Sequence, residues 1–200
     1  MISRCLVMPA LLITVPLLCS VQEVSAGDIK GTIKILGGKG LEHVVVYIEQ
    51  VQQETFSAPT KNATVDQVRM TFVPHVLPIL AGTTVDFPNS DSTRHNVFSP
   101  SKTKKFNLGT YPAGVSKKVT FDKTGVVSLL CNVHPEMSAY LLVLQNPYYA
   151  MPEKDGKYSI AEIPPGRYAL IVWHPRFKPK RMEVTVPGKG SVAVDAFLDE

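Results

Sequence analysis

Cysteine is scarce in this chain, and its few cysteines are unevenly placed. The 200 residues include three cysteines. Cys5 and Cys19 lie in an apolar N-terminal run, and only Cys131 lies beyond it. Once that run is removed, no intramolecular disulfide can form. The motif Cys-x-x-Cys-His is absent, which excludes the usual covalent attachment of a c-type haem.

A strong charge of either sign is also missing. Lysine and arginine total 21, aspartate and glutamate total 17, and the formal net charge is +4. This balance is too weak to indicate a nucleic-acid partner. Basic residues still gather in three stretches, either as solvated strand faces or as a patch that steers an acidic partner. They are Lys102, Lys104, Lys105, Lys117, Lys118, Arg176, Lys178, Lys180 and Arg181.

Long amphipathic helical patterns are absent as well, and β-type patterns with intervening turn signals run through the chain. We therefore predict an all-β fold of β-sandwich architecture. The expected strands are Ile29–Leu36, Val44–Ile48, Val68–Val73, Thr83–Phe87, Val115–Phe121, Val126–Leu130, Ala139–Leu144, Tyr158–Ile160, Arg167–Trp173, Met182–Val186 and Val192–Phe197.

The N-terminus has the pattern of an export signal. A short basic start that ends at Arg4 precedes an apolar run broken by prolines, and Val24-Ser25-Ala26 supplies small residues for cleavage. Residues 1–26 are predicted to be a signal peptide, which places the mature protein in the periplasm. A single-span anchor is the alternative, but the run is short and broken by proline. No stable membrane insertion is expected after cleavage.

Four residues could converge on one metal ion. Cys131, His134 and Met137 follow one another at short spacing, and His95 lies upstream. An unpaired thiol in an oxidising compartment calls for an explanation, and metal ligation holds it as a shielded thiolate. A buried, inert cysteine is the alternative, but it leaves the spacing of His134 and Met137 unexplained.

This ligand set is typical of a type 1 copper site. Two histidines and a cysteine form a trigonal plane, and methionine is a weak axial ligand. Soft sulfur stabilises Cu(I), while imidazole suits both oxidation states. Zinc also binds cysteine and histidine, but a methionine ligand favours a softer metal. We expect Cys131, His134 and Met137 on one turn between two strands, and His95 on a distant loop.

Residues 64–146 resemble a small cupredoxin of the plastocyanin and amicyanin type. The matching motifs are Phe72-x-Pro74, Gly82-Thr83-Thr84-Val85-x-Phe87-x-Asn89, His95-Asn96-Val97 and Cys131-x-x-His134-x-x-Met137. The segment is also similar to plastocyanin-like proteins labelled "methylamine utilization protein". The resemblance implies a Greek-key β-sandwich that binds one copper ion through His95, Cys131, His134 and Met137. It further implies that Asn96 links the two ligand loops by hydrogen bonds.

The flanking segments resemble a second module. Asp155-Gly156-Lys157-Tyr158 through Gly166-Arg167-Tyr168 resembles a carboxypeptidase regulatory-like, transthyretin-like β-sandwich, and Gly31-Thr32-Ile33 with Val44–Ile48 supplies the usual beginning. We predict a discontinuous domain of residues 27–57 plus 148–200, with the cupredoxin inserted into one of its loops. The alternative packs Gly27–Val51 on the cupredoxin as extra edge strands.

The remaining histidines are His43, His75 and His174. Each is interpreted as a surface or interdomain packing residue. Together they could form a second metal site only if the two domains fold toward each other.

Three classes of function fit these residues. The leading prediction is an exported one-electron carrier whose partners are redox proteins, such as an acidic cytochrome or a dehydrogenase. The alternative is a periplasmic copper-binding or delivery protein. An enzyme is the third, and the sequence predicts against it, because repeated His-x-His motifs are missing and Met137 would fill the open coordination position.

Overall fold

The structure, a computed structural model, describes residues 25–199. Nearly all of its regular structure is strand, so the predicted all-β fold class is confirmed. The elements are β1 Gly27–Ile35, η1 Leu41–His43, β2 Val45–Ile48, β3 Ala63–Thr64, β4 Asp66–Val68, β5 Thr71–Val73, β6 Val76–Leu80, β7 Thr83–Pro88, β8 His95–Ser99, β9 Phe106–Tyr111, β10 Ser116–Phe121, β11 Gly125–Leu130, β12 Ser138–Leu144, β13 Tyr149–Ala150, β14 Lys157–Ile163, β15 Gly166–His174, β16 Phe177–Val186, β17 Ser191–Ala193 and β18 Ala196–Leu198.

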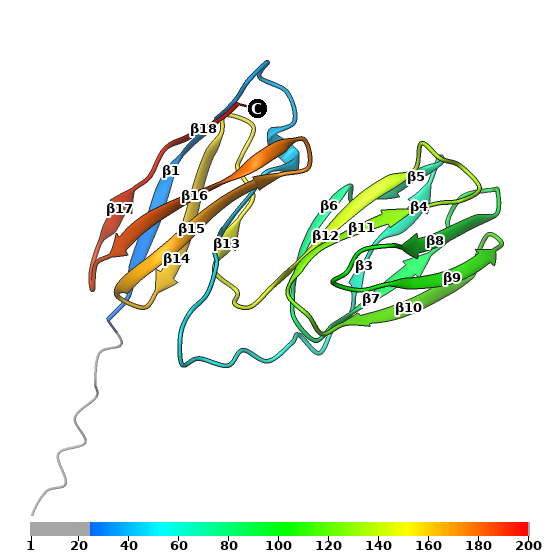
Figure 1. Cartoon of the computed structure of the whole chain (residues 1–200), viewed down its shortest axis with the longest axis horizontal. Coiled ribbons are helices and arrows are strands. Elements are labelled where there is room, and N and C mark those ends of the chain that lie inside the picture. Colours follow the sequence, from blue (N-terminus) through cyan, green and yellow to red (C-terminus); the bar gives the residue numbers. More distant parts are fainter. Residues whose placement is uncertain (1–24, 200) are drawn as a thin grey trace, which may run out of the picture.

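Figure 1 shows two β-sandwiches side by side. The first, here the flanking sandwich, contains both ends of the described chain. In one of its sheets β1 lies between β14 and β17 and also pairs with β18; the other sheet has the order β13-β2-β15-β16. Ile29, Ile33 and Ile35 of β1 are buried while Lys30 and Lys34 are exposed, as the period of two in a strand requires.

The second unit, here the ligand sandwich, lies between β2 and β13 in the chain. Its sheets have the orders β10-β7-β3 and β6-β12-β11-β8-β9. Along β7, Thr83, Val85 and Phe87 are buried, and the residues between them are half-buried. The two sheets enclose a core of buried side chains, which comprises Val65, Phe72, Ile79, Val85, Phe87, Val97, Tyr111, Phe121, Val127, Leu129, Cys131, Met137, Ala139, Leu141 and Val143.

A third apolar cluster, here the joint, connects the sandwiches. Val45, Ile171 and Trp173 come from the flanking sandwich, and they pack with residues of β6 and β12 from the ligand sandwich. The Trp173 ring meets Tyr140 with a centroid separation of 5.7 Å and an angle of 64° between the rings. The joint therefore buries aromatic and aliphatic surface from both units.

One predicted strand is divided in the structure. The expected strand Val68–Val73 covers the last residue of β4, a turn and the whole of β5, and β4 and β5 pair antiparallel. Arg69 and Met70 make the turn between them, with φ angles of 52° and 55°. Residues other than glycine seldom adopt this left-handed backbone conformation. Arg69 and Met70 therefore gave no sign of a turn in the sequence, and the apolar pattern alone predicted a continuous strand.

The remaining differences are local. The expected strand Val192–Phe197 is divided into β17 and β18, which pair with different parts of β1. Strands β3, β6, β8, β9 and β13 were not predicted, and His95 begins β8 instead of lying on a loop. Prolines or short length weaken the pattern of several of these segments.

The predicted signal peptide, residues 1–26, lies almost entirely outside the described residues. Within residues 25–199, no helix has the length and hydropathy needed to cross a bilayer.

Candidate metal centre

The loop after β11 carries three of the four predicted ligands. Cys131 directly follows β11, and Met137 directly precedes β12. Both side chains are buried, with exposed fractions of 4% and 1%, and both belong to the core of the ligand sandwich. The Met137 N–H donates to the carbonyl oxygen of His134, which closes the loop into a turn. His134 is half-buried at the tip of this turn.

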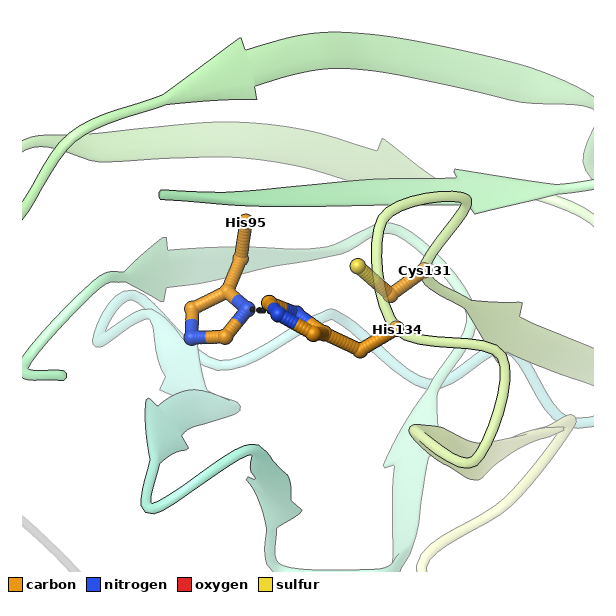
Figure 2. A group of neighbouring side chains, drawn as sticks. All are labelled: His95, Cys131 and His134. Atoms are coloured by element: carbon orange, nitrogen blue, oxygen red, sulfur yellow. Dashed lines mark hydrogen bonds between the residues drawn. The ribbon is translucent and has the colours of Figure 1, made fainter. Parts of the chain in front are cut away.

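His95 approaches from the neighbouring strand β8 and is fully buried. One ligand atom from each of His95, Cys131 and His134 can be chosen so that all three lie within 4.8 Å of one another. The Nδ1 atoms of the two imidazoles are 2.9 Å apart. Figure 2 shows the two rings meeting beside the Cys131 sulfur. The fold thus brings together side chains that are far apart in the sequence.

A carboxylate that the sequence analysis missed holds the His95 ring. Asp91 Oδ2 lies 3.0 Å from His95 Nε2, opposite the ring atom that faces His134. Because a carboxylate accepts, the proton of the neutral ring resides on Nε2 and the Nδ1 lone pair points into the site. The indication in the sequence that could have revealed this contact was the acidic residue four positions before His95.

Asp91 is itself held in place. The Met70 N–H donates to Asp91 Oδ2 over 2.7 Å, and the Ser92 N–H donates to Oδ1 over 2.8 Å. These contacts, led by the Met70 N–H and followed by the His95 side chain, lower the pKa of Asp91 to about 2. The carboxylate is therefore ionised at neutral pH. The left-handed turn at Arg69 and Met70 supplies the first of these donors.

Asn96 lies next to the cluster, as the resemblance implied, but its contacts differ from the expectation. Its backbone N–H donates to Cys131 Sγ over 3.5 Å. Its side-chain amide donates to Asn107 Oδ1 in β9 over 2.8 Å. The link from β8 to the ligand loop is therefore made by the backbone.

The donor set fits a copper ion. His95 and His134 offer imidazole nitrogens, Cys131 offers a thiol sulfur at the same point, and Met137 is buried in the same core. The two facing Nδ1 atoms can share one proton, or both can direct lone pairs to a metal. Soft sulfur combined with imidazole suits copper.

The three remaining histidines lie elsewhere, and they lie together. The His43 ring is 4.8 Å from the His75 ring and 6.2 Å from the His174 ring, measured between centroids. The basic stretches are partly paired: Lys104 lies 3.5 Å from Asp122, and Arg181 contacts both Glu49 and Glu183.

Comparison with known proteins gives resemblances to copper proteins. No family model matches the chain, and no curated protein matches it. Similar structures include a purple cupredoxin from Nitrosopumilus maritimus, at 26% identity over 41% of this chain and 99% of that one, with a TM-score of 0.38. A reduced variant of amicyanin matches at 20% identity over 49% of this chain and 97% of that one, with a TM-score of 0.40.

A copper-containing nitrite reductase from Thermus scotoductus SA-01 is also similar, at 27% identity and a TM-score of 0.41. The match covers 46% of this chain and 26% of the enzyme. The prediction that the chain is not an enzyme is therefore wrong, because a copper enzyme is among the similar structures. Missing His-x-His motifs in one chain do not exclude catalysis. All three scores are low, and the fold is established here by the strands themselves.

Proposed function

We propose that this chain is an exported type 1 copper protein that carries one electron at a time between redox partners. The observation that carries the proposal is the meeting of His95, Cys131 and His134 within 4.8 Å inside a β-sandwich whose buried core also contains Met137. The ligands would be these three residues and Met137. Bound copper would supply a one-electron couple, which none of the side chains has at an accessible potential.

The surroundings of the ligands suit electron transfer. His95, Cys131 and Met137 are buried, which keeps water from the site and limits rearrangement on a change of charge. His134 is the ligand whose ring reaches the surface. The side chain of Val133 next to it is 44% exposed, and Met70 is 48% exposed. Exposed apolar side chains of this kind suit a small docking surface for transient partners.

We also propose the division into domains. The signal peptide would be residues 1–26, the cupredoxin residues 64–146, and the carboxypeptidase regulatory-like sandwich residues 27–57 plus 148–200. Separate buried clusters and the separate sheets of the flanking sandwich support this division. Cleavage of the signal would place the mature protein in the periplasm. The flanking sandwich would then position the copper domain for its partners.

The test is the spectrum of the purified mature chain after addition of one equivalent of Cu(II). We expect intense blue absorption and narrow copper hyperfine splitting by EPR, because thiolate–copper bonding is strongly covalent. Ascorbate should bleach the colour, and an oxidant should restore it. A pale protein that loses its metal on reduction would contradict the carrier proposal and support copper delivery instead.

Asp91 should tune the reduction potential. Replacing it by asparagine (Asp91→Asn) keeps an oxygen acceptor near His95 Nε2 but removes a negative charge. Because that charge favours Cu(II) over Cu(I), we expect the potential to rise while the blue colour remains. Voltammetry of both proteins measures the shift. Asp122→Asn, at an exposed carboxylate of the same sandwich, is the control and should leave the potential unchanged.

A further inference from the structure

All five histidines of this chain belong to two groups. Two lie in the candidate metal centre, and the other three, His43, His75 and His174, line one cavity of about 470 Å³. His43 ends η1 and His174 ends β15 in the flanking sandwich, while His75 precedes β6 in the ligand sandwich. The cavity lies at the junction of the sandwiches, since Ser138 and Tyr140 of β12 also line it. This grouping requires an explanation beyond surface placement.

His75 is prepared for metal binding through one defined atom. Its Nδ1 lies 2.9 Å from the carbonyl oxygen of Ser138, and because a carbonyl can only accept, Nδ1 carries the proton. Nε2 then holds a free lone pair. A backbone carbonyl on the second ring nitrogen is the usual arrangement behind a metal-binding histidine.

His43 completes a pair across the junction. Its ring centroid is 4.8 Å from that of His75, with 56° between the ring planes. Two imidazoles on one tetrahedral metal have centroids about 5 Å apart, given metal–nitrogen bonds of about 2 Å. Glu42 Oε1 lies 3.6 Å from His43 Nε2, and this side chain is 70% exposed and free to rotate. Among the described residues, Glu42 has the one carboxylate within 4.0 Å of a ring nitrogen of this pair.

His174 lies against the pair but has a different role. The Arg176 N–H donates to His174 Nδ1 over 3.1 Å, so the neutral ring carries its proton on Nε2 and has no free lone pair. The His174 ring is 1% exposed and lies next to the His43 ring. It is therefore a packing residue and not a ligand.

We propose that His43 and His75, together with the carboxylate of Glu42, bind a second metal ion, a divalent transition ion such as Cu²⁺ or Zn²⁺. Imidazole with one carboxylate suits these ions, and copper ranks highest among divalent first-row metals at such sites. Lys39 and Arg176 also line the cavity, and their positive charges do not attract a cation. The ion would therefore be held by its bonds to the ligands and not by an excess of negative charge around it. Because the ligands come from both sandwiches, a bound ion fastens one to the other.

The test is the stoichiometry of Cu(II) binding by the whole mature chain, followed by EPR. We expect a second equivalent with an ordinary axial signal and wide hyperfine splitting, in addition to any blue signal. His43→Gln and His75→Gln should each weaken the second equivalent at least tenfold. Glu42→Gln, a surface change that leaves the core intact, should weaken it as well. His174→Gln is the matched control and should retain it.

This proposal and the type 1 copper proposal fail separately. In Cys131→Ser the blue signal should vanish while the second equivalent remains. A wild-type protein without a second equivalent would overturn the inference. Competition by inorganic phosphate for the cavity, without metal binding, would overturn it in favour of an anion site, since Lys39 and Arg176 could hold one. Equal loss in His174→Gln and His75→Gln would overturn the assignment of ligands.

Discussion

Cys131→Ser should yield a colourless protein. The intense visible band of a type 1 site arises from charge transfer between thiolate and copper, and a serine hydroxyl supplies no comparable donor at neutral pH. Loss of a residue that hydrogen-bonds to a metal ligand lowers metal affinity roughly 10–100-fold. Loss of the ligand itself should lower the affinity for copper by more than this. Absorption spectra and Cu(II) titration of the two proteins measure both effects. A Cys131→Ser protein that remained blue would exclude Cys131 as the ligand.

The substitution is small, which makes the result interpretable. Cys131 is 4% exposed, and serine is slightly smaller, so the fold should persist. Circular dichroism of both proteins checks this. Asn132→Ala is a matched control in the same loop at an exposed position, and it should keep the blue colour. Loss of colour in this control would mean that any disturbance of the loop abolishes the site.

Phe87→Ala should destabilise the ligand sandwich by about 3–5 kcal/mol, the usual cost of truncating a buried phenylalanine. The Phe87 ring is fully buried, 6.1 Å from the Phe106 ring and 6.5 Å from the Phe121 ring between centroids. If the two sandwiches are separate domains, calorimetry should resolve two transitions. Phe87→Ala should lower the melting temperature of only one.

Leu170→Ala is the matching change in the core of the flanking sandwich, where this side chain is fully buried. It should cost about 2–5 kcal/mol and lower the other transition. In His43→Gln, which removes a ligand of the metal ion proposed between the sandwiches, one equivalent of copper should raise only the transition that Phe87→Ala lowers, because a ligand stabilises the unit to which it binds. A single transition moved equally by both substitutions would contradict the proposed division into domains.

Much of the fold was predictable from local patterns. Alternation of buried and exposed residues in β1 and β7 depends only on the period of a strand, and turn residues mark the ends of many strands. The loop between β11 and β12 was predictable for the same reason, because an apolar run precedes Cys131 and another follows Met137. Periodicity failed where the chain turns within an apolar pattern, at Arg69 and Met70.

The sequence by itself determined the all-β class and the short loop that carries Cys131, His134 and Met137. It also indicated His95, upstream of that loop, as the fourth candidate ligand. Each depends on spacing along the chain or on the chemistry of a side chain. Only the tertiary structure decided which distant groups meet. In the folded chain the Asp91 carboxylate lies beside Nε2 of His95, and the rings of His43 and His75 lie next to each other where the two sandwiches meet. Such contacts depend on the packing of one sheet or sandwich against another, which no local period encodes.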